Sequence, residues 1–82
     1  MYELVYSDTA TRQLEKLTSD TQRRILRALE RIRIRPEAYV TRLVGQSYYR
    51  FRVGDYRVIL DVLHQRLLIL VIEVGHLKNA YK

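Results

Sequence analysis

A run of alternating arginine and aromatic residues, residues 48–57, holds the side chains best suited to chemistry in this chain. Successive side chains of a strand point to opposite faces, so Arg50 and Arg52 share one face. Arg57 falls on a neighbouring strand, after a turn at Gly54-Asp55. If its face matches, three guanidinium groups converge on one patch. Such a patch is solvated, paired with nearby acids, or open to an anion, and the spacing alone favours none of these.

Tyrosines interleave with these arginines, at Tyr48, Tyr49, Tyr56 and, further along, Tyr81. This composition is typical of surfaces for single-stranded RNA, where bases stack on aromatic rings and phosphates pair with arginine. For any single strand tyrosine a structural role is the better interpretation. Tyr81 is the exception, because it follows the last expected strand. His76, at the end of an apolar run, is a candidate base or a structural hydrogen-bonding group.

Composition narrows the remaining possibilities. The chain has 82 residues, no cysteine and two histidines, so thiolate chemistry and a histidine-rich metal site are excluded, and we expect no metal and no cofactor. It contains no glycine-rich phosphate loop, and no apolar run of about 18 residues that would predict a membrane span. Fifteen Lys and Arg against nine Asp and Glu give a net charge of +6, which favours a polyanionic partner. A cytoplasmic location fits this composition.

Periodicity predicts a single α+β domain over residues 1–82, in the order β-α-α-β-β-β. Residues 2–6 form a strand, and Ser7 or Asp8 caps a first helix. Residues 18–20 cap a second helix that ends at or just before Pro36. We expect strands at 48–53, 56–63 and 67–74 to form an antiparallel sheet, with the helix hairpin packed on one of its faces.

The second predicted helix carries a basic face. With the expected boundary at Pro36, this face includes Arg23, Arg24, Arg27, Arg31 and Arg35. Such a face can bind a phosphate backbone or dock an acidic protein, but runs of charge are most often solvated. We keep that interpretation as the default.

The order of these elements and their motifs resemble the RelE family of bacterial and archaeal toxins, within the RelE/ParE superfamily. The motifs are Leu43-Val44-Gly45, the run 49–59, and Val74-Gly75-His76 with Tyr81 after it. The resemblance implies a ribosome-dependent endoribonuclease that cuts mRNA in the decoding site by metal-independent attack of the RNA 2′-OH. It also implies an acidic, RelB-like antitoxin that wraps the toxin in a hetero-oligomer.

Site residues follow from the same resemblance. Arg57 matches the strand arginine that stabilises the phosphate charge, Arg50 and Arg52 match the preceding basic positions, and Tyr81 matches the tyrosine that orients or deprotonates the 2′-OH. The expected substrate-binding residues are Lys78, Tyr48 and His76.

The chain departs from the family pattern at Leu77, where an arginine usually stands. Either Lys78 supplies the missing charge, or the nuclease is weakened, or the leucine is a selected or deliberate substitution that lets the toxin be expressed safely. Two other functions therefore stay open: a ParE-like DNA gyrase inhibitor, and a non-catalytic, antitoxin-binding co-repressor.

Overall fold

The computed structural model describes residues 1–80, and the predicted order of one strand, two helices and three strands is confirmed. Two elements were not predicted: a two-residue strand before the arginine strand, and a short C-terminal helix. The elements are β1 (Glu3–Tyr6), α1 (Asp8–Glu15), α2 (Ser19–Arg31), β2 (Thr41–Arg42), β3 (Tyr49–Val53), β4 (Tyr56–Leu63), β5 (Leu68–His76) and α3 (Leu77–Ala80). Short 3₁₀ turns, η1 (Pro36–Ala38) and η2 (His64–Arg66), lie between them.

The strands form one sheet in the order β1-β5-β4-β3-β2. The pair β1 and β5 is parallel, and the other neighbouring pairs are antiparallel. β5 therefore lies between β1 and β4, which explains why its sequence is almost continuously apolar. The pairing of β4 with β5 shifts after Ile59: Ile59 faces Glu73 and Leu60 faces Val71, so Ile72 is the extra residue of a β-bulge.

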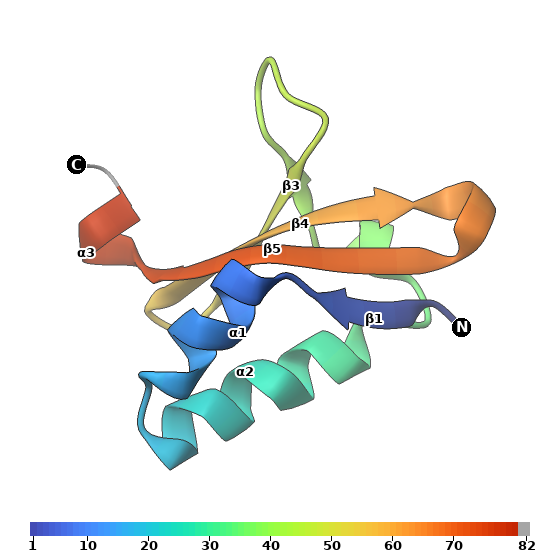
Figure 1. The fold of residues 1–82 in the computed structure, drawn as a ribbon. Coiled ribbons are helices and arrows are strands. Elements are labelled where there is room, and N and C mark those ends of the chain that lie inside the picture. Colours follow the sequence, from blue (N-terminus) through green and yellow to red (C-terminus); the bar gives the residue numbers. More distant parts are fainter. Residues whose placement is uncertain (81–82) are drawn as a thin grey trace.

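Both long helices begin where a side chain caps them. The Ser7 hydroxyl accepts a hydrogen bond from the backbone N–H of Ala10, and Thr18 accepts one from Thr21. α1 and α2 lie along the same side of the sheet in Figure 1. Their buried residues join the inward-facing residues of β3, β4 and β5 in one apolar core: Ala10, Leu14, Ile25, Leu29, Ile32, Phe51, Val53, Val58, Leu60, Val62, Ile69, Val71 and Val74.

α2 ends at Arg31, earlier than the sequence pattern predicts. Arg35 therefore lies outside the helix, with φ −145° and ψ 76°. Arg35 is not helical because the ring of Pro36 disfavours helical geometry in the residue before it. Pro36 instead begins η1, where its missing N–H is not needed.

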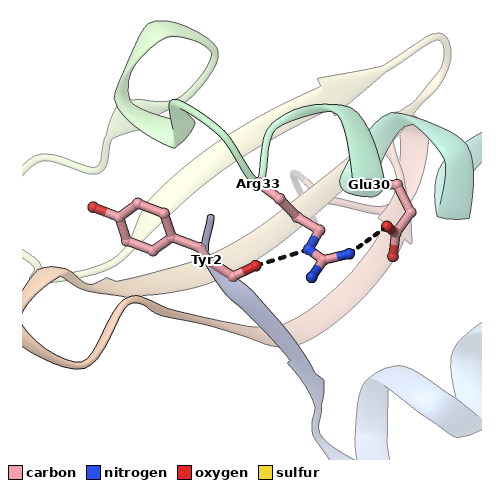
Figure 2. A network of polar contacts seen from close by, with 3 residues as sticks. All are labelled: Tyr2, Glu30 and Arg33. Atoms are coloured by element: carbon pink, nitrogen blue, oxygen red, sulfur yellow. Dashed lines mark hydrogen bonds and ion pairs between the residues drawn. The ribbon is translucent and has the colours of Figure 1, made fainter.

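The segment after α2 is tied to the first strand by Arg33 (Figure 2). Its Nε donates to the backbone oxygen of Tyr2 at 2.7 Å, and its Nη1 donates to Glu30 Oε1 at 2.7 Å. The backbone N–H of Tyr2 in turn donates to the Arg33 carbonyl at 2.8 Å. These bonds fix the end of α2 against the start of β1.

Candidate functional site

The three strand arginines lie on the same face of the sheet, away from the core. Arg52 pairs directly with Arg57 across β3 and β4, and Arg50 lies two residues from Arg52. Their strand neighbours, such as Phe51 and Val58, point into the core. Because side chains alternate along each strand, all three guanidinium groups are on the face opposite the core. We call this face the open face.

Arg50 and Arg52 line a hollow of about 340 Å³, which we call the strand hollow; its lining residues are Tyr39, Thr41, Arg50, Arg52 and Leu77. Arg52 Nε donates to the Gly54 carbonyl at 3.2 Å. The backbone N–H of Leu77 donates to the carbonyl of Asp55 at 2.8 Å. The β3–β4 turn thereby holds Arg52 and Leu77 against the same hollow.

Arg57 lines a second hollow on the open face, the Arg57 hollow, whose lining residues are Leu43, Gln46, Tyr48, Arg57, Ile59, Ile72 and Glu73. Its Nε is buried and has no hydrogen-bond partner within the part of the chain that the structure describes. Burying a charged donor without an acceptor is unfavourable, by about 1–3 kcal/mol or more for a charged group. This donor is therefore unsatisfied, and an anion can reach it only if the side chains that cover it move.

None of the three arginines is neutralised by an acid within the described residues. The ion pair formed there joins Arg33 to Glu30, far along the chain from the strand arginines. Glu73 lines the Arg57 hollow but lies beyond ion-pair distance of Arg57. Asp55 and Asp61, the acids nearest to the arginines in the sequence, form no ion pair within residues 1–80 either. Arginines that form no ion pair keep their charge and donors available to an anion.

The other predicted site residues separate into three groups. Tyr48 lines the Arg57 hollow, as a substrate-binding residue would. His76 pairs with Tyr56, a residue packed against the core, and their rings meet edge to face at 5.1 Å. It therefore faces the helix side of the sheet, and its Nδ1 accepts the backbone N–H of Lys78 at 3.1 Å. Lys78 is exposed in α3, and Tyr81 lies outside the described residues.

Sequence reasoning missed Glu73, Thr41 and Tyr39 as lining residues. Glu73 reaches the Arg57 hollow beside Ile72 because of the β-bulge, and no sequence signal marks that bulge. Thr41 pairs with Arg50 from β2, a strand of two residues that is too short to show a periodic pattern. Tyr39 follows η1 and is half exposed; an aromatic residue just after a proline-led turn was the available signal.

Over residues 1–80, no three or more His, Asp or Glu side chains gather closely enough to hold a metal ion. In the same part of the chain, no helix has both the length and the apolar character needed to cross a membrane.

Comparison with known proteins identifies the fold and the family. The family model for the ParE toxin of type II toxin-antitoxin systems, parDE, matches residues 4–81, so the chain belongs to this family. It is a toxin of a type II toxin–antitoxin system with a RelE-like fold, and the resemblance to the RelE/ParE superfamily is confirmed. A comparison with curated proteins found no match.

Solved structures of RelE toxins are similar over nearly the whole chain. The intact RelBE toxin–antitoxin complex of E. coli is 25% identical, with a TM-score of 0.80, covering 93% of this chain and 96% of that one. The archaeal RelE–RelB complex of Pyrococcus horikoshii is 27% identical, with a TM-score of 0.80 and coverage of 96% and 98%. RelBE2 of Mycobacterium tuberculosis, at 20% identity and a TM-score of 0.82 (92% and 96% covered), shares the fold.

Proposed function

We propose that this toxin is a ribosome-dependent endoribonuclease that cleaves mRNA and so stops translation. One observation carries the proposal: Arg50, Arg52 and Arg57 lie together on the open face and form no ion pair with an acid of residues 1–80. A phosphodiester supplies the missing negative charge and acceptors for their donors. Similarity to solved RelE toxins supports the same interpretation, whereas the family model that matches is that of the ParE toxin.

The proposed reaction is attack of an RNA 2′-OH on the adjacent phosphorus. The 2′-oxygen bonds to phosphorus, the bond from phosphorus to the 5′-oxygen breaks, a base takes the 2′-OH proton, and an acid protonates the leaving oxygen. Arg50, Arg52 and Arg57 stabilise the charge that develops on the phosphoryl oxygens. Tyr81 is our candidate for orienting or deprotonating the 2′-OH, and Lys78 for an additional phosphate contact.

We propose dependence on the ribosome because these residues can stabilise charge but are poorly suited to proton transfer. Arginine neutralises charge but does not release a proton near neutral pH. His76, the candidate base, faces the helix side of the sheet and not the open face, so we do not propose it as a substrate contact. The ribosome would position the mRNA for in-line attack, which is worth a large part of such a barrier. We place this activity in the cytoplasm, where translation takes place.

The antitoxin is the second proposed partner, as an acidic, RelB-like chain that wraps the toxin and forms a hetero-oligomer with it. The open face offers two kinds of surface for such a chain. One end carries the strand arginines, and the other carries apolar side chains that are exposed or only half-buried: Val5, Leu63, Leu68 and Leu70. A segment with both carboxylates and apolar anchors matches both ends.

The test is mRNA cleavage on programmed ribosomes by the parent chain, Arg57→Gln and Arg66→Gln. Arg66 lies exposed in η2, so its replacement is a charge-matched control. We expect cleavage by the parent and the control, and a rate about 10²–10³-fold lower for Arg57→Gln. Equal rates for the two variants would show that Arg57 does not act in cleavage, and no cleavage by the parent would overturn the proposal.

Leu77 favours one other function, a toxin that acts by binding alone. Its apolar side chain lines the strand hollow beside Arg50 and Arg52, where it donates nothing to an anion. Under this second candidate function the chain inhibits DNA gyrase or acts with its antitoxin as a co-repressor. Parent chain that binds antitoxin or gyrase but leaves ribosome-bound mRNA intact would support it.

A further inference from the structure

The arginines of α2 form a basic surface outside the proposed reaction site. They line a hollow that also reaches the end of β3, and we call it the α2 hollow: Arg23, Arg24, Arg27, Arg31, Ala28 and Val53. Asp20, at the start of α2, is the acid that lines it, yet it forms no ion pair in the described residues. All four arginines are exposed.

Shared residues connect this surface to the strand hollow. Arg31 also lines a neighbouring hollow, the bridging hollow, with Ile34, Arg35, Ala38 and Tyr39. Tyr39 in turn lines the strand hollow, with Arg50 and Arg52. The two basic surfaces are thus joined through one arginine and one half-exposed tyrosine.

The β3–β4 turn connects them a second time. The Gly54 carbonyl accepts Arg52 Nε, and a Cβ placed on Gly54 would lie 3.2 Å from Nη1 of Arg24. Arg24 of α2 and Arg52 of the open face therefore both lie beside Gly54, one on each side of the sheet.

We propose that these surfaces form one continuous RNA-binding track. It runs from α2 across Tyr39 to the strand arginines, with phosphates along the arginines and a base stacked on Tyr39. The inference rests on the proposed function and deepens it, because it assigns a path to the RNA strand beyond the scissile phosphate. Arg23, Arg27 and Arg31 repeat every four residues, which places them in one row on the helix surface.

Charge and chemistry favour RNA over an acidic polypeptide on this track. A docked polypeptide needs an apolar anchor, and the core of such interfaces is depleted of charge. The α2 hollow offers little apolar surface, because Ala28 is small and Val53 is 8% exposed, and the large exposed aliphatic side chain along the described track is Ile34 in the bridging hollow. A nucleic-acid backbone needs only the cations, and arginines flanking an exposed aromatic ring are a single-strand binding pattern.

The test is binding of the whole chain to a fluorescent, single-stranded 2′-O-methyl RNA of about 12 nucleotides, within the site sizes known for single-strand binding. The probe cannot be cleaved through its 2′-oxygens, so binding is measured apart from chemistry. Affinity is followed by fluorescence anisotropy over a series of KCl concentrations. The variants are Arg27→Gln/Arg31→Gln and Tyr39→Ala, with Tyr39→Phe and Lys16→Gln/Arg66→Gln as controls.

The track predicts different responses for its two parts. Each phosphate contact contributes about 0.7 to the slope of log affinity against log salt for a single strand, so Arg27→Gln/Arg31→Gln should lower that slope by about 1.4. Tyr39→Ala should weaken binding about tenfold with the slope unchanged, and Tyr39→Phe should bind like the parent. The charge-matched Lys16→Gln/Arg66→Gln pair, exposed and outside the track, should keep the parent slope.

Two results would overturn the track. One is an unchanged slope in the Arg27→Gln/Arg31→Gln variant, and the other is an equal change in both charge-removal pairs, which would indicate nonspecific attraction. An unchanged slope together with weaker antitoxin binding would assign the surface to the acidic polypeptide instead. If ribosomal cleavage requires Arg57, the proposed function stands whether or not the track binds RNA. If the track binds RNA but the parent chain does not cleave mRNA, only the proposed nuclease activity is overturned.

Discussion

Replacing Leu77 with arginine should raise nuclease activity while it lowers stability. The Leu77 side chain is partly buried and lines the strand hollow with Arg50 and Arg52. Its backbone N–H is held at 2.8 Å by the carbonyl of Asp55, so the position of residue 77 is fixed independently of its side chain. A guanidinium at this position would reach the same hollow as the two strand arginines.

The two effects have magnitudes that can be worked out separately. One additional well-placed donor to a phosphoryl oxygen is worth about 3 kcal/mol in the transition state, or about 10²-fold in rate. In the absence of RNA, guanidinium groups ~6 Å apart in water-like surroundings repel by about 1 kcal/mol. Loss of a partly buried leucine removes about 1 kcal/mol more. We therefore expect about 10²-fold faster cleavage and a free energy of unfolding lower by about 2 kcal/mol.

Cleavage is measured on programmed ribosomes, and the free energy of unfolding by urea titration. Leu77→Gln controls for loss of the apolar side chain, and Lys78→Gln asks whether that lysine already supplies the charge. The reasoning is refuted if Leu77→Arg cleaves no faster than Leu77→Gln while the chain stays folded. If Lys78→Gln alone abolishes cleavage, Lys78 compensates for the leucine, and the gain from Leu77→Arg should be correspondingly small.

Three further predictions concern stability, each measured by urea unfolding. Arg33→Gln should lower the free energy of unfolding by about 2 kcal/mol, because the hydrogen bond to the Tyr2 carbonyl is lost. Glu30→Gln should lower it by less than about 1 kcal/mol, since its ion pair with Arg33 is exposed. Equal losses in the two variants would contradict this account. Burial, and secondarily the Glu30 carboxylate, raises the pKa of Tyr6. The unfolded chain therefore ionises first, so stability should fall as pH rises above about 10, and less steeply in Tyr6→Phe; identical profiles would count against it. Gly54→Ala should destabilise by about 1–2 kcal/mol, because φ at Gly54 is +57°, and Gly75→Ala should be milder because nothing lies within 4 Å of its Cβ position; a Gly75→Ala loss as large would contradict the argument.

Strand periodicity was enough to predict part of the site. Alternation alone placed Arg50 and Arg52 on one face, and the short turn at Gly54 brought Arg57 opposite Arg52. The orphaned Nε of Arg57 could not be predicted, because its burial depends on side chains from outside the two arginine strands, including Glu73 beyond a β-bulge. A one-residue insertion changes which side chains share a face, and nothing in the composition of β5 announces it.

The helices show the same limit. Capping residues marked where α1 and α2 begin, because caps are local chemistry. The sequence pattern placed the end of α2 too far along the chain. The apolar period continues through Ile32, but the helix ends at Arg31, before the chain reaches Pro36. Tyr39 was not predicted as a lining residue, because its position depends on that boundary. It lines two hollows only because η1 carries the chain back toward β3.

The position of β5 has a consequence for when the sheet of this toxin is completed. β5 is the last strand to be synthesised, yet β1, the first strand made, pairs with no other strand, and β4 pairs with β5 as well as with β3. The sheet therefore cannot close during early translation, and contacts between sequence-distant strands form slowly. A nascent chain can pair β2, β3 and β4, but it lacks the complete sheet until residues 68–76 have left the ribosome. Strand order therefore predicts a delay between the synthesis of the strand arginines and the completion of the sheet that supports them.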